Sequence, residues 1–226
     1  MNHIRTQIIA RLLRLLLVLT SLATLGSAQA VTIHWGNSLF DTLRQSDGIT
    51  PINNIDFTVQ LGFFDGLTPD ISNVDQWQAS WRVFDQANFN SAIGYFTGSA
   101  NLSETTRTSD SPFAQATNPL TTFPSTAQAH IWISNGGAAN QPGTEWAVFT
   151  NPNWTFPESG QHDQVEWRVS DPGTTAVFGA VVTPFAGPST IEAATFPIIP
   201  EPGTTALLLL GLSLVFCRRT VRISPS

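Results

Sequence analysis

The sequence contains no lysine, and all ten of its basic residues are arginines. Between residues 31 and 199, four arginines face fifteen acidic residues, a formal balance of −11. Such a domain repels the phosphates of nucleic acids and of anionic lipids, so we expect no nucleic-acid partner. The remaining partner classes are cations, cationic surfaces and neutral polymers such as sugars, unless the acidity only keeps an exported protein soluble.

Cysteine is almost as scarce, because Cys217 is the only one and lies close to the C-terminus. The chain before it therefore has no disulfide, no thiol nucleophile and no cysteine-based metal site. Burial and backbone hydrogen bonds must hold the domain together. All seven tryptophans and fourteen of the fifteen phenylalanines belong to this domain and supply large apolar side chains for such a core.

The motifs of common enzymes are also missing. The sequence has no Gly-x-Ser-x-Gly turn, no phosphate-binding loop and no dinucleotide fingerprint. His34, His130 and His162 stand apart, and none has a second histidine at a spacing typical of metal ligands. We therefore predict that the protein is not an enzyme and binds no cofactor.

The densest polar cluster leaves an alternative open. His162, Asp163 and Glu166, with Glu158 nearby, could hold a metal ion or supply the paired carboxylates of a secreted glycoside hydrolase. Because Glu166 falls on the solvent face of a predicted strand beside Arg168, we expect these two side chains to pair with each other instead.

A second acidic group gives a weaker indication of calcium. Asp65, Asp70 and Asp75 flank one loop, and their carboxylate oxygens are ligands that suit Ca²⁺ outside the cell. The loop lacks the Asp-x-Asp-x-Asp-Gly pattern, so calcium stays a minor alternative to a domain without metal.

The N-terminus has the three parts of a secretory signal peptide. A basic opening without acidic residues precedes an apolar stretch at 15–25, and Ala28 and Ala30 follow with the spacing of a cleavage site. We therefore predict that residues 1–30 are removed and that Val31 begins the mature chain.

The C-terminus carries a short uncharged run between prolines and arginines. As a helix, residues 204–217 would span about 21 Å, less than the hydrocarbon core of about 30 Å. Pro200 and Pro202 keep the preceding chain extended. Three arginines follow the run: Arg218, Arg219 and Arg222. Arginines beside an apolar run stay on the cytoplasmic side of a membrane, so both ends of the chain predict a domain outside and a basic tail inside.

Pro200-Glu201-Pro202, the apolar run and the arginine pair Arg218-Arg219 together resemble the PEP-CTERM sorting signal of Gram-negative bacteria, which here would occupy residues 199–226. The resemblance implies recognition by an exosortase, a membrane cysteine protease, with cleavage near the Pro-Glu-Pro motif. It also implies transient anchoring in the inner membrane, followed by transfer to the cell surface or to an exopolysaccharide matrix. The alternative is a minimal membrane anchor that is not cleaved.

Residues 31–198, between the two signals, have the pattern of one mainly β domain. Apolar and polar residues alternate at 31–35 and 57–63, as in half-buried strands. Four more runs rich in β-branched and aromatic residues follow, separated by turn-forming residues: 129–134, 145–150, 165–170 and 175–183. We predict an antiparallel β-sandwich-like domain.

One segment departs from this alternation. Four apolar residues fall on one helical face: Val74, Trp77, Trp81 and Phe84. We predict an amphipathic helix at 73–84, opened by Ser72 and Asp75, with its tryptophans packed on the sheet. An exposed aromatic platform for sugars is the alternative.

The same segment and later tryptophans look like a domain common among PEP-CTERM proteins. The matching positions are Gly66-Leu67-Thr68-Pro69, Trp77, Trp81, Trp132, Trp146 and Trp154-Thr155-Phe156-Pro157. Leu67 stands where that domain has phenylalanine. The resemblance implies no activity.

These observations predict an exported, non-enzymatic protein of the cell surface or extracellular matrix, sorted and cleaved through its C-terminal segment. A carbohydrate-binding module of the same matrix, with or without calcium, is the second hypothesis, and a secreted hydrolase is the third.

Overall fold

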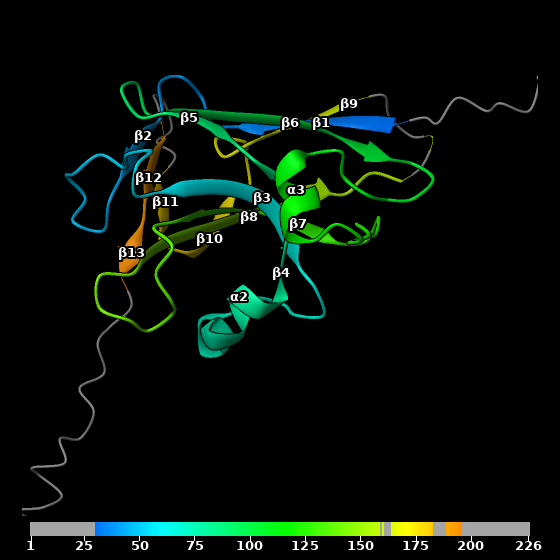
Figure 1. Cartoon of the computed structure of the whole chain (residues 1–226). Helices are drawn as coiled ribbons and strands as arrows, with labels where there is room; N and C mark the ends of the chain where they lie inside the picture. The colour runs from blue at the N-terminus through cyan, green and yellow to red at the C-terminus, as the bar shows by residue number, and fades with distance from the viewer. Residues whose placement is uncertain (1–29, 159, 161–163, 183–188, 196–226) are drawn as a thin grey trace, which may run out of the picture.

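Strands form most of the regular secondary structure of the domain, and helical segments are few and short (Figure 1). The computed structural model describes residues 30–158, 160, 164–182 and 189–195. The strands are β1 (Ala30–Gly36), β2 (Thr42–Arg44), β3 (Thr58–Phe64), β4 (Trp81–Gln86), β5 (Asn88–Asn90), β6 (Tyr95–Ser103), β7 (Gln128–Ser134), β8 (Glu145–Thr155), β9 (Gln164–Arg168), β10 (Thr175–Phe178), β11 (Ala180–Val182), β12 (Thr190–Glu192) and β13 (Ala194–Thr195). The helical segments are η1 (Ile71–Gln76), α2 (Trp77–Ser80) and α3 (Pro112–Thr117).

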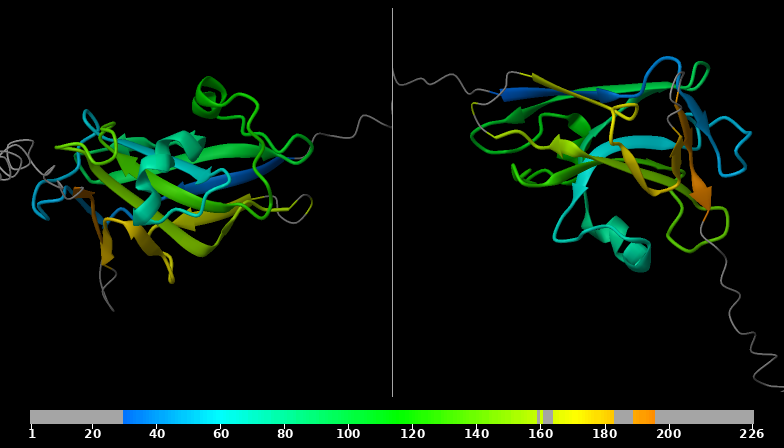
Figure 2. Two further views of the ribbon diagram at one scale, coloured as in Figure 1. Left: turned by 90° about the horizontal axis from the view of Figure 1, so that it is seen from below. Right: turned by 180° about the vertical axis from the view of Figure 1, so that it is seen from behind.

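Two sheets lie over each other, as Figures 1 and 2 show from three directions. The upper sheet has the order β5-β6-β1-β9, and the lower sheet has the order β10-β8-β7-β3-β4 with β13 joined to β8. A small third sheet, β11-β12-β2, closes one end. This mainly β architecture with several antiparallel sheets is consistent with a β-sandwich.

The main core lies between the two large sheets. Alternate residues of β3 point into it, so that Val59 and Leu61 are fully enclosed. From the upper sheet, Ile33 and Trp35 of β1 and Phe96 of β6 meet them. The core is built by period-2 alternation, which explains why the strand pattern is visible in the sequence.

The lower sheet also buries its outer face. There, η1 and α2 cover a second group of buried side chains, centred on Trp77, Trp132 and Trp146, which we call the outer cluster. Because both faces of this sheet are covered, its middle strands are nearly continuous in apolar residues, as β7 shows with five consecutive buried positions.

All six predicted strand regions are confirmed, with small changes at their ends. The run at 175–183 is divided between β10 and β11, because Gly179 has a positive φ of 83° that interrupts a strand. Two pairings are parallel rather than antiparallel, β1 with β9 and β12 with β2. The predicted antiparallel pairing is therefore wrong at these two places.

The predicted helix at 73–84 is wrong in extent. The helical part ends at Ser80, and Trp81 begins β4 with extended backbone angles. Phe84 joins the main core, whereas Trp77 and Trp81 join the outer cluster, so these side chains do not share one face. Asp70, not Ser72, caps the segment: its carboxylate accepts from the Ser72 amide at 2.9 Å, and Asn73 closes the capping box.

The described chain begins and finishes at opposite ends of the sandwich (Figure 1). Ala30 pairs with Ser103 at the far end of β6, whereas Thr195 pairs with Glu145 at the start of β8. The last described residue precedes Pro200 by only five positions.

Candidate functional site

The residues predicted to direct sorting are almost all outside the described part of the chain. Pro200, Glu201, Pro202, Ala28 and the three C-terminal arginines, Arg218, Arg219 and Arg222, belong to this group. Ala30 is described and is exposed at the start of β1. Within the described ranges, no helix is long and apolar enough to cross a membrane, and the run 204–217 is not among them.

The tryptophans are buried rather than displayed. All seven have relative exposures of 8% or less. In the outer cluster, Trp81 donates from Nε1 to Gln60 Oε1 at 3.0 Å, and Trp77 donates to Asn73 Oδ1 at 2.7 Å. The prediction that Trp77 and Trp81 are core residues is confirmed, and the alternative of an exposed tryptophan platform for sugars is wrong.

A groove opens beside the outer cluster, at the end of β3 where the chain turns toward η1. It has a volume of about 500 Å³ and lies between the loop 65–69 and the segment 124–128. Apolar side chains form part of its wall, among them Phe63, Leu67 and Pro69. A second hollow of about 590 Å³ adjoins it and shares Phe63, Asp65 and Pro124 with it. We call the two hollows together the end groove.

The polar groups of the end groove are mostly neutral. Six threonines line it: Thr68, Thr117, Thr121, Thr122, Thr126 and Thr150. Its charged residues are Asp65 and Arg82, whose Oδ2 and Nη2 atoms lie 3.3 Å apart. The two charges of this pair cancel, so the groove has hydrogen-bonding groups but no net charge. Such a lining suits a neutral, hydroxyl-rich molecule better than a phosphate or a metal ion.

His130 lies at the bottom of the end groove and is uncharged at neutral pH. The residue is 4% exposed, and its Nδ1 lies 3.0 Å from the carbonyl oxygen of Gln128. The rings of His130 and Phe64 form a T-shaped pair with a centroid distance of 5.1 Å. Burial lowers the pKa of His130 from 6.5 to about 4, although the bond to Gln128 raises it.

Asp85 forms a buried polar link between the two sheets, which no pattern in the sequence predicts. Its Oδ2 accepts from Trp35 Nε1 of the upper sheet at 2.9 Å, and its Oδ1 accepts from Ser111 Oγ at 2.7 Å. Burial raises the pKa of Asp85, while the two hydrogen bonds oppose that shift. Both oxygens face partners inside the domain, so the link is structural.

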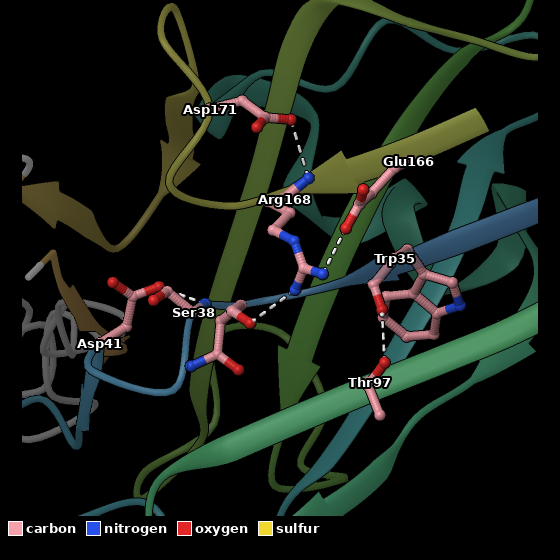
Figure 3. Close-up of polar contacts among 8 residues, drawn as sticks. Trp35, Ser38, Asp41, Thr97, Glu166, Arg168 and Asp171 are labelled. Carbon is pink, nitrogen blue, oxygen red and sulfur yellow. Dashed lines mark hydrogen bonds and ion pairs between the residues drawn. The ribbon is translucent and has the colours of Figure 1, made fainter.

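The predicted pairing of Glu166 with Arg168 is confirmed (Figure 3). Arg168 also donates from Nη1 to the carbonyl oxygen of Asn37 at 3.1 Å, and its backbone amide donates to Asp171. The arginine therefore ties β9 to the loop after β1. Since Glu166 is engaged in this way and His162 and Asp163 lie outside the described residues, the carboxylate pair expected for a hydrolase is not formed in the part that is described.

Asp65 and Asp70, two of the acidic residues considered for calcium, have different partners and do not meet at one site. Asp65 pairs with Arg82, and Asp70 caps η1, where the hydrogen bonds from Ser72 lower its pKa. The described residues contain no group of three or more histidine, cysteine or acidic side chains that could hold a metal ion.

Comparison with known proteins gives no match: no family model, no curated protein and no solved structure is similar to this chain.

Proposed function

We propose that this chain is an exported, non-enzymatic protein with an acidic β-sandwich-like domain. An exosortase-type protease sorts and cleaves it through Pro200-Glu201-Pro202. The apolar run 204–217 holds it in the inner membrane until then, and the domain afterwards belongs to the cell surface or the extracellular matrix. The observation that carries the proposal is the order of the chain. Described strands start at Ala30, beside the predicted signal-peptide site, and finish at Thr195, just before the sorting motif.

The chemistry of the described domain supports a role without catalysis. Its buried ionisable groups, Asp41, Asp85 and His130, bond to groups inside the fold. Its paired charges, Asp65 with Arg82 and Glu166 with Arg168, neutralise each other. These residues position loops and strands and show no arrangement of nucleophile and base.

Replacement of Glu201 tests the proposal in the native host. We expect Glu201→Ala to leave the C-terminal segment attached and the protein in the inner-membrane fraction, because the motif would lose its only charge. Thr195→Ala, at the exposed end of β13, is the matched control and should be processed normally. Equal processing of both variants would show that Glu201 is not read by a protease.

The end groove supports a second candidate function, binding of a neutral glycan. Its threonines, its balanced Asp65–Arg82 pair and the partly exposed apolar side chains of Leu67 and Pro69 together suit a sugar chain. We expect Asp65→Asn to weaken retention of the chain on a gel that contains the host's extracellular polysaccharide. Asp75→Asn, a substitution at an exposed residue of η1 outside the groove, is the control. Equal retention of both variants would remove this candidate.

A further inference from the structure

Exposed apolar side chains gather at one end of the sandwich. Among the described residues, nine large hydrophobic side chains are exposed, and six of them lie on loops and strand ends around β2 and β12. These six are Leu39, Phe40, Ile49, Ile55, Ile93 and Val182. Single exposed apolar residues are ordinary on a protein surface, but their concentration at one end indicates a contact surface. We call this set the apolar end.

The loops that carry these residues touch one another. Asn37 Nδ2 donates to the Gly94 carbonyl oxygen at 2.9 Å, which joins the loop of Phe40 to the turn of Ile93. Ser91 Oγ donates to Asn54 Oδ1 at 3.1 Å, which joins that turn to the loop of Ile55. Phe40 is 79% exposed and Ile55 is 89% exposed, so the joined loops present apolar tips to the solvent.

The chain leaves the domain beside the same loops. Thr195 pairs with Glu145. Ser46 Oγ, in the loop that carries Ile49, donates to Glu145 Oε1 at 2.7 Å. Figures 1 and 2 show β2, β12 and β13 together at this end, away from α3. The segment that leads to the apolar run 204–217 therefore starts next to the apolar end.

We propose that the apolar end docks on the lipid interface of the bilayer that holds residues 204–217, an inference that rests on the proposed function. The eight residues 196–203 can extend over at most about 29 Å, so the domain stays within reach of the bilayer surface. A tether this short gives a high effective concentration, and a few apolar tips then suffice for docking. Phenylalanine and isoleucine at loop tips suit the boundary between headgroups and acyl chains.

The charges near the apolar end select the kind of lipid. Five carboxylates lie in or beside its loops: Asp41, Asp47, Asp56, Glu145 and Glu192. The arginines there are Arg44 and Arg168, and Arg168 is already paired with Glu166. These carboxylates favour a zwitterionic surface and oppose docking on an anionic one. Docking by this end also leaves the end groove, at the opposite end of β3, facing away from the membrane.

A polarity-sensitive fluorophore tests the proposal in the chain from Val31 to Ser226, which keeps the C-terminal segment and lacks the apolar stretch at 15–25. Cys217→Ser removes the only native thiol, and Phe40→Cys or Ile93→Cys then places a nitrobenzoxadiazole label at the apolar end. Leu120→Cys, at an 88% exposed residue of the groove end, is the matched control. Each labelled chain is reconstituted into phosphatidylcholine vesicles, and its flotation with the vesicles is checked. Circular dichroism confirms that each variant is folded.

We expect blue-shifted and stronger emission at positions 40 and 93, no shift at position 120, and a smaller shift when phosphatidylglycerol is added. Chains that float without a shift at position 40 or 93 would overturn the docking and leave the tail's membrane role intact. Chains that do not float would overturn both. A shift that vanishes when vesicles are added in excess would mean that a second copy of the chain covers the apolar end, which also contradicts the proposal.

Discussion

At the scale of single residues, His130 links the stability of the domain to pH. The folded state keeps its ring neutral, because burial lowers its pKa from 6.5 to about 4. As the pH falls from 6.5 to 4, the His130 ring becomes protonated in the unfolded chain but stays neutral in the folded chain. The free energy of unfolding contributed by His130 is therefore complete above pH 6.5 and is lost as the pH falls to about 4.

We expect His130→Phe to remove this part of the pH dependence. Phenylalanine keeps the ring contact with Phe64 and does not titrate. Between pH 7 and pH 4.5, the wild-type free energy of unfolding should fall by about 2–3 kcal/mol more than that of the variant. Urea unfolding at both pH values measures the difference. His34→Gln, at an exposed residue, should behave like the wild type, and equal pH responses of all three proteins would contradict the expectation.

Trp81 is expected to be a large contributor to stability. It is 8% exposed, packs against Phe64 at a centroid distance of 4.9 Å and donates a hydrogen bond to Gln60. Trp81→Ala should lower the free energy of unfolding by about 3–5 kcal/mol, because it opens a cavity in the outer cluster. Thermal and chemical unfolding measure this, with Phe113→Ala, at a 42% exposed residue, as the control. An unchanged melting temperature would refute the core role of Trp81.

At the scale of elements, alternation predicts strands well where one face is buried, as in β1 and β3. The prediction of one helix at 73–84 was wrong because a short helical turn and the strand after it place tryptophans at a helical spacing. Trp77 covers the sheet from α2, and Trp81 reaches the same cluster from β4. Tertiary packing joined them, and local periodicity cannot distinguish that arrangement from one continuous helix.

Features that depend on distant parts of the chain were not predictable. The link from Trp35 through Asp85 to Ser111 joins residues 50 and 26 positions apart. The end groove likewise forms only when the loops around Asp65 and Pro124 meet. By contrast, the pairing of Glu166 with Arg168 needed only a local strand, and the sequence was sufficient to predict it.

Gly98 in β6 is expected to be intolerant of any side chain. A Cβ atom there would lie 2.2 Å from Trp35 Nε1 and 2.6 Å from Asp85 Oδ2. It would therefore push apart the two side chains whose hydrogen bond links the sheets. We expect Gly98→Ala to lower the free energy of unfolding by about 1–3 kcal/mol. Ser99→Ala, at the neighbouring exposed position, should change it little in the same urea titration. Similar values for both variants would contradict the close approach of Trp35 to β6.

Across the domain as a whole, the two ends of the sandwich carry different exposed surfaces. The end groove lies where β3 finishes, and the apolar end lies where the chain leaves toward Pro200-Glu201-Pro202, the proposed sorting motif. Two exposed surfaces of different chemistry, one neutral and hydroxyl-rich and one apolar, therefore point in opposite directions. This arrangement agrees with a domain that is held at a membrane by one end while its other end is free to meet the surroundings.

The mature protein is proposed to have lost both terminal segments, and the intact mass of the protein isolated from the surface of its native host measures this loss. We expect a chain that starts at Val31 and finishes near Pro202, without the run 204–217 and the arginines after it. A mature chain that still finishes at Ser226, at normal abundance, would mean that the proposed cleavage does not occur and that the C-terminal segment is a permanent anchor.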